Sequence, residues 1–250
     1  MSSVGASRRS KGMKRKRRII LPAVLVLVLL AGAFFLYAED YYRAEAPAIE
    51  ALASGGSVTV TETDYGWFFD GPADADALIF YPGGKVEETA YAPLLHRLAA
   101  GGLDVCLVKM PFRLAIFGVD RAAGIMEKYD YGRWFVGGHS LGGAAAAMFA
   151  AKHPEPAGVI LLAAYPTKPL EAGDLELTVY GAEDGVLNRE KLAAGRQYAS
   201  DRAEEIRLPG ANHAQFGNYG PQAGDGTASL TPEEQQAETA ELIFRYLREN

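Results

Sequence analysis

The chain has 250 residues, of which 49% are hydrophobic and 22% charged, a composition that is typical of a folded domain and excludes general disorder. Residues 1–18 contain eight basic and no acidic residues, so the remainder has 17 basic against 31 acidic residues and a net charge of −14. Such a domain repels phosphate, and we expect no nucleic-acid partner. The single cysteine, Cys106, excludes an intramolecular disulfide, and no cysteine–histidine pattern indicates a metal site.

An uncharged apolar run, residues 19–38 (IILPAVLVLVLLAGAFFLYA), directly follows the basic arm 1–18. About 20 residues at a rise of roughly 1.5 Å each span the core of a bilayer. Basic residues before the run, with Glu39 and Asp40 after it, put the N-terminus in the cytoplasm by the positive-inside rule. The sequence therefore predicts a single-pass cell-membrane anchor that meets the lipid bilayer through 19–38, with 39–250 outside the cytoplasm.

The apolar run has two other interpretations. A cleaved signal peptide has the same charge pattern, but the run is long for one, and the small residues of Ala44–Ala46 are followed by Pro47. A buried helix of a soluble domain would not lie beside eight cations. We expect Pro22 in the first turn of the membrane helix, where its missing N–H costs little. Residues 39–56 are interpreted as a polar, alanine-rich stalk before a folded domain at 57–250.

From residue 57 onward, β-type runs alternate with helical patterns. The β-type runs are residues 57–63, 65–69, 77–81, 105–109, 134–137, 158–163, 175–180 and 203–208. The helical patterns are residues 87–100, 119–128, 141–152, 188–200 and 232–248. The last begins with Thr231 as N-cap, Pro232 at the first position and Glu234 completing a capping box. The alternation predicts an α/β fold, a mostly parallel doubly wound sheet with an antiparallel start and helices on both faces.

The pentapeptide Gly138–Gly142 (GHSLG) has the pattern G-x-S-x-G around Ser140. An apolar strand leads into it and an alanine-rich helix leads out, which is the setting of a nucleophile elbow. Glycines flank the serine in such a turn because a Cβ there would clash where strand and helix approach closely. The alternative is a serine that only caps the following helix.

A nucleophilic serine needs an adjacent base, and the chain has four histidines. Three of them are interpreted as structural: His96, His139 and His153. His213 follows the last β-type run in a loop, where sites of open α/β sheets form, and is our candidate base. Asp184 follows the preceding run by a glycine turn and is our candidate acid, with Glu183 as its rival.

From about residue 77 to the C-terminus the chain resembles the α/β-hydrolase superfamily, because the order Ser140, Asp184, His213 is that of its triad. It is similar to compact, uncapped bacterial members related to dienelactone hydrolases. FYPGGK (80–85) followed by VKMPF (108–112) resembles a bacterial subgroup of often membrane-anchored hydrolases. The resemblance implies a sheet of about eight strands without a large cap. It also implies an oxyanion hole made by the N–H of Leu141 and a second donor, Gly84 or Lys85.

The function predicted on this basis is hydrolysis of an ester or thioester of a small molecule through an acyl-enzyme, without a metal or organic cofactor. Phe112 and Arg113 are expected to help shape the substrate pocket, together with Phe117 and the glycine-rich loop 217–230. Two alternatives stay open. One is a serine peptidase or amidase that uses the same triad, and the other is a catalytically inactive binding protein on a hydrolase fold.

Overall fold

The computed structural model describes residues 4–250, with side chains from Pro22 onward, so residues 1–3 and the side chains of the predicted basic arm lie outside the described part. The chain divides into two compact units at Asp40/Tyr41.

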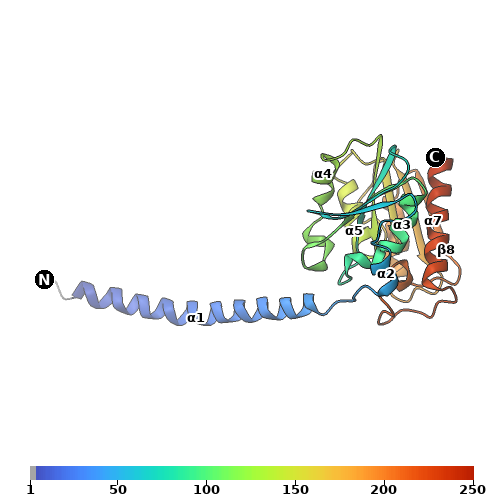
Figure 1. Cartoon of the computed structure of the whole chain (residues 1–250). Coiled ribbons are helices and arrows are strands. Elements are labelled where there is room, and N and C mark those ends of the chain that lie inside the picture. Colours follow the sequence, from blue (N-terminus) through green and yellow to red (C-terminus); the bar gives the residue numbers. More distant parts are fainter. Residues whose placement is uncertain (1–3) are drawn as a thin grey trace. The chain divides into compact units, whose positions relative to one another are not determined.

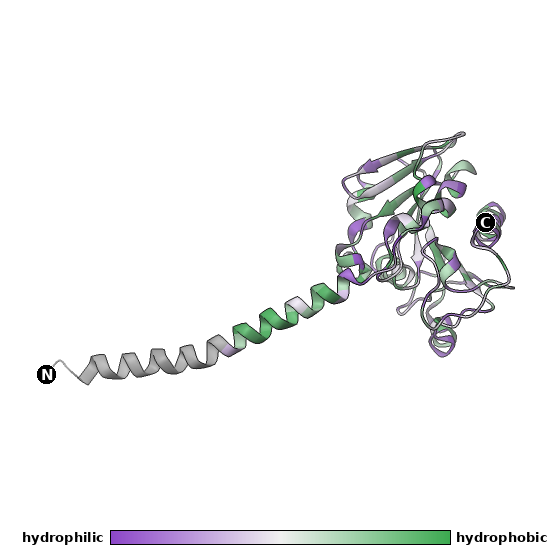
Figure 2. Ribbon diagram, turned by 60° about the horizontal axis from the view of Figure 1, so that its bottom comes forward, coloured by the Kyte–Doolittle hydropathy of each residue, from purple (hydrophilic) through white to green (hydrophobic). Residues whose placement is uncertain are grey.

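The first unit is one long helix, α1 (Val4–Glu39). Its segment Pro22–Glu39 has 18 residues and a mean hydropathy of 2.1, so it is long and apolar enough to cross a membrane. Figure 2 shows this apolar stretch in green, and its large side chains are exposed, Leu36 by 76%. The sequence predicts Pro22 in the first turn of the membrane helix, and this prediction is wrong. Pro22 lies inside α1, because the helix already begins at Val4.

The second unit is built on one eight-stranded sheet, ordered β1-β2-β4-β3-β5-β6-β7-β8. Its strands are β1 (Thr59–Thr63), β2 (Gly66–Asp70), β3 (Asp76–Tyr81), β4 (Asp104–Val108), β5 (Arg133–His139), β6 (Gly158–Leu162), β7 (Leu175–Gly181) and β8 (Arg202–Leu208). β2 pairs antiparallel with both β1 and β4, and all other pairs are parallel. The predicted architecture, a mostly parallel sheet with an antiparallel start, is confirmed.

Helices cover both faces of this sheet (Figure 1). On one face, Leu95 and Leu98 of α3 (Ala92–Ala100) and Ile243 of α7 (Pro232–Glu249) join the core. On the other face, Ile125 of α4 (Arg121–Met126) and Phe149 of α5 (Leu141–Ala150) do the same. A further helix, α6 (Arg189–Gly195), follows β7 and packs Leu192 into a small cluster with Tyr180. Burial on both faces explains why the central strands are almost continuously apolar.

Helix boundaries follow local capping and proline chemistry. α7 begins with the predicted capping box, in which Thr231 Oγ1 accepts from Glu234 N at 3.2 Å and Glu234 Oε2 accepts from Thr231 N at 2.8 Å. The predicted helix 87–100 is instead a 3-10 turn, Glu88–Tyr91, followed by α3. Pro93 explains the break, because it has no N–H to continue a helix from the preceding turn and belongs at a helix start.

The segment interpreted as a stalk is largely part of the second unit, which is a correction to the predicted boundary at residue 57. Tyr42 forms a parallel bridge with Val86, and the short helix α2 (Ala46–Glu50) fully buries Ala48. The apolar Ala48 and the alternating backbone partners of Tyr42 hold the segment on the domain, which a polar composition alone did not indicate.

Candidate active site

Ser140 lies on a strained turn between β5 and α5, with φ 52° and ψ −120°. Its N–H donates to the carbonyl of Leu162 at 2.8 Å, which fixes the turn to the neighbouring strand β6. A Cβ on either Gly138 or Gly142 would collide with the carbonyl of Tyr81. Glycine is therefore required on both sides of the serine, as expected of a nucleophile elbow.

Asp184 and His213 form a buried pair behind this turn. His213 Nδ1 lies 2.8 Å from Asp184 Oδ2, and the side chains are 2% and 0% exposed. The other oxygen, Asp184 Oδ1, accepts from the backbone N–H groups of Val186 at 2.9 Å and Leu187 at 2.7 Å. Burial raises the pKa of the Asp184 carboxyl, but the His213 hydrogen bond and these N–H groups outweigh it and leave the pKa below 3.8. Asp184 is thus an ionised acceptor, whereas the side chain of its rival Glu183 is exposed.

His213 lies at the same pocket as Ser140. Nε2 is buried and has no hydrogen-bond partner among the described residues. Ser140 and His213 line the same pocket of about 270 Å³. The rest of its lining is mostly apolar and comes from Leu141, Ala144, Ala163, Ala164, Tyr165, Val186, Leu187 and Asn188. The candidate base and the strained serine thus line one small, mostly apolar cavity.

Residues 77–237 match the alpha/beta hydrolase family. The chain belongs to this family. No curated protein matches it significantly. Among solved structures it is similar to Est1E from Butyrivibrio proteoclasticus, with 14% identity, a TM-score of 0.52, and 77% of this chain and 100% of that one covered. A predicted CIB-like hydrolase from Thermoplasma acidophilum has 15% identity, a TM-score of 0.52 and the same coverage. TT1662 from Thermus thermophilus has 15% identity and a TM-score of 0.52, over 77% of this chain and 97% of that one. At these identities the structures support the fold alone.

The loop after β3 contributes one free N–H beside the elbow of this α/β hydrolase. Pro82 has no N–H, that of Gly83 donates to Tyr91 Oη at 3.0 Å, and that of Lys85 donates to the carbonyl of Arg113 at 2.8 Å. Lys85 is therefore not the second oxyanion donor, a correction to one of our two alternatives. Gly84 is the remaining one, and a Cβ on it would lie 2.9 Å from the Leu141 side chain.

The backbone N–H of Leu141 also faces no helical acceptor, because Leu141 is the first residue of α5. The N–H groups of Leu141 and Gly84 are therefore the two candidate oxyanion donors. An oxyanion hole requires such a pair.

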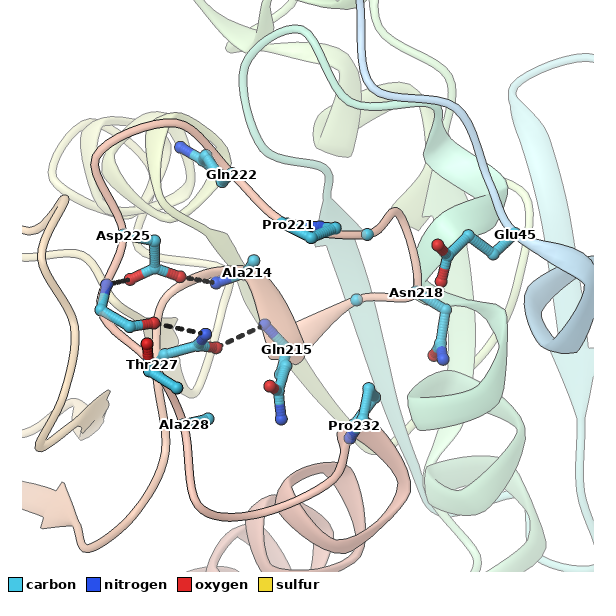
Figure 3. A pocket seen from close by; sticks show the side chains of 14 residues that line it. Glu45, Ala214, Gln215, Asn218, Pro221, Gln222, Asp225, Thr227, Ala228 and Pro232 are labelled. Carbon is cyan, nitrogen blue, oxygen red and sulfur yellow. Dashed lines mark hydrogen bonds between the residues drawn. The ribbon is translucent and has the colours of Figure 1, made fainter.

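Asp225 ties the loops of the acid and the base together, and sequence reasoning missed it. Its Oδ1 accepts from the N–H groups of His213 at 3.2 Å and Gly185 at 3.1 Å, and its Oδ2 accepts from Ala214 N at 2.8 Å. Figure 3 shows this carboxylate pointing to the backbone of Ala214. Its setting, Gly224-Asp225-Gly226, has the composition of an ordinary turn, so the local sequence contained no signal of the role.

His139, which the sequence predicts to be structural, contacts the candidate base directly. Its ring centroid lies 4.5 Å from that of His213, and its Nδ1 lies 2.8 Å from Tyr91 Oη. Burial, followed by the proximity of His213, lowers the pKa of His139 well below 6.5, so the ring is neutral. His96 lies on α3, and His153 stacks on Phe149 with 4.2 Å between ring centroids.

Phe112 and Arg113 do not line the pocket of Ser140 and His213. Both have positive φ, 55° and 56°, in the loop after β4. The Arg113 carbonyl accepts from Lys85 N, its guanidinium lies 3.5 Å from the ring centroid of Tyr41, and Phe112 contacts Phe117 at 5.8 Å between centroids. The pocket thus gives no support to the predicted role of these two residues in substrate binding, and the Arg113 backbone instead contacts the β3 loop.

The loop 217–230 likewise lines a different, more polar pocket of about 480 Å³, together with Glu45 and Gln215 (Figure 3). This pocket contains neither Ser140 nor the His213 side chain. Among the described residues, no group of three or more His, Cys, Asp or Glu side chains could hold a metal ion.

Proposed function

We propose that this α/β hydrolase is a serine esterase that cleaves small carboxylic esters or thioesters through an acyl-enzyme. The observation that carries the proposal is the buried Asp184–His213 pair. His213 lines the same pocket as Ser140, and its Nε2 has no hydrogen-bond partner among the described residues. A hydroxyl at pH 7 is a weak nucleophile, and a neutral imidazole oriented by a carboxylate is the group that activates it.

In the proposed reaction, Ser140 Oγ attacks the substrate carbonyl carbon while His213 Nε2 takes the hydroxyl proton. The negative charge that develops on the carbonyl oxygen is stabilised by the N–H groups of Leu141 and Gly84. Asp184 holds the imidazole in the tautomer with a proton on Nδ1 and stabilises the imidazolium. The leaving alcohol or thiol takes the proton from Nε2, and water then hydrolyses the acyl-serine by the same route.

The small volume and alanine-rich lining of the pocket support a substrate with a short apolar group. The apolar length of α1 supports attachment of the enzyme to the cell membrane through 19–38. The basic residues before this run support a cytoplasmic N-terminus with the hydrolase domain outside.

Replacement of the nucleophile tests the proposal. Ser140→Ala should lower kcat/KM for p-nitrophenyl butyrate by at least about 10³-fold, because the acyl-enzyme can no longer form. The thermal unfolding midpoint should stay near that of the parent, because Ser140 lies at a partly exposed turn. Ser229→Ala, an exposed serine, is the matched control.

Labelling by a fluorophosphonate probe separates the alternatives. The parent and Ser229→Ala should be labelled, and Ser140→Ala should not. Faster cleavage of peptide amides than of esters would favour a peptidase, and a parent chain that is neither labelled nor active would favour an inactive binding protein.

A further inference from the structure

The segment Tyr42–Glu45, directly after the first unit, contacts the loop of the candidate oxyanion donor. Tyr42 N donates to the carbonyl of Lys85 at 2.8 Å, and Glu87 N donates to the carbonyl of Tyr42 at 2.9 Å. Ala44 N donates to Glu87 Oε2 at 3.0 Å. Lys85 has a left-handed φ of 58°. Its N–H donates to Arg113 and its carbonyl accepts from Tyr42, so both of its backbone polar groups are hydrogen-bonded. The backbone next to Gly84 is therefore fixed by partners outside its own loop.

The same segment also contacts the chain that follows His213. Glu45 N donates to the carbonyl of Asn218 at 2.9 Å, and Ala223 N donates to Tyr42 Oη at 3.2 Å. The rings of Tyr42 and Tyr219 lie 5.6 Å apart. Residues 218–223 follow the short turn Ala214–Phe216 and contain no helix or strand of their own. Figure 3 shows Glu45 beside Asn218.

We propose that Tyr42–Glu45 is a positioning element, the brace, which sets the oxyanion loop and the histidine loop in register with each other. This inference rests on the proposed esterase function. Through its backbone the brace hydrogen-bonds to Lys85, Glu87 and Asn218, and through the Tyr42 hydroxyl it accepts from Ala223 N. Oxyanion donors act only when they are about 2.7–3.1 Å from the developing charge, so a small shift between the two loops lowers kcat. Substrate affinity in the pocket does not depend on that alignment.

The brace lies at the N-terminal end of the second unit. It begins two residues after Asp40, where the first unit ends. This positioning element therefore lies outside 77–237, the part that matches the family.

The test removes one brace hydrogen bond in the full-length chain in detergent. Glu45→Pro deletes the N–H that reaches Asn218, and the native φ of −85° at Glu45 is close to the value that proline requires. Ala46→Pro is the matched control, because this neighbouring residue is the first of α2, where proline is favoured. We expect Glu45→Pro to lower kcat about tenfold with KM unchanged. We expect Ala46→Pro to leave both constants within about twofold of the parent.

Tyr42→Phe is a milder variant that keeps the backbone bonds and the ring but loses the oxygen that accepts from Ala223. It should lower kcat by about twofold to fivefold, again without a change in KM. Parent-like kcat in both Glu45→Pro and Tyr42→Phe would overturn the proposal, whatever the change in unfolding temperature. So would an equal loss in Ala46→Pro.

Hydrogen exchange keeps this result separate from the fate of the proposed function. In Glu45→Pro, faster amide exchange in both 83–87 and 214–223 supports the brace even if the parent hydrolyses no ester and fluorophosphonate does not label Ser140. Unchanged exchange in either loop overturns it.

Discussion

At the scale of single residues, His139 makes the stability of the fold depend on pH. Its pKa is held well below 6.5 by burial and by His213, so the folded chain keeps it neutral. As pH falls below about 6.5, the unfolded chain binds a proton here and the folded chain does not, which favours unfolding. The free energy of unfolding should therefore fall with pH below 6.5 by up to about 1.4 kcal/mol per pH unit from this group.

His139→Gln should remove that contribution, so the unfolding midpoint should change less between pH 7 and pH 5 than in the parent. Asp184 acts in a separate window: its lowered pKa stabilises the fold above 3.8, and this contribution is lost only as pH falls further. His96→Gln, a partly exposed histidine on α3, is the control. Denaturant unfolding at each pH measures the slopes, and equal slopes in His139→Gln and the parent would contradict the expectation.

At the scale of elements, the loops after β7 and β8 are held together by Asp225. Asp225→Asn replaces one of the two acceptor oxygens with an NH₂ group. That NH₂ group would face a backbone N–H, of His213 or of Ala214, that donates to the carboxylate in the parent. We expect kcat for ester hydrolysis to fall about tenfold and the protein to lose about 1–3 kcal/mol of stability. Steady-state kinetics and denaturant unfolding measure both. Asp201→Asn, an exposed aspartate outside these loops, should change neither, and parent-like kcat in Asp225→Asn would argue against the role.

These elements also show which features could be predicted from the sequence alone. Patterns that depend on near neighbours were predictable, such as the capping box at Thr231, the glycines around Ser140 and the alternation that gives the sheet. The partners of Lys85 N and of Asp225 were not, because Arg113 and Gly185 are far away along the chain. The ends of the sheet strands bring such loops together only after the fold forms.

At the scale of the whole molecule, the same reasoning explains why the sequence predicts a stalk at 39–56. A short polar, alanine-rich segment has no periodicity of its own, and its place on the domain is decided by backbone bonds to Val86, Glu87 and Asn218. The apolar stretch of α1, in contrast, was predictable from the sequence, because a membrane-spanning helix is defined by its length and its apolar composition.

The membrane anchor gives the last prediction. Full-length protein made in a bacterial host should sediment with membranes and resist extraction at alkaline pH, because about 18–20 apolar residues are buried in lipid. Leu27→Lys with Leu29→Lys should shift it to the soluble or aggregated fraction, because each lysine at the centre of a span costs about 2.5–3.5 kcal/mol. Leu27→Ile with Leu29→Ile keeps the hydropathy and is the matched control.

In spheroplasts, external protease should digest the hydrolase domain of the parent, because the positive-inside rule puts it outside the cytoplasm. A soluble parent whose mass lacks the first 40 or so residues would indicate a cleaved signal peptide, and protection of the domain from protease would reverse the topology.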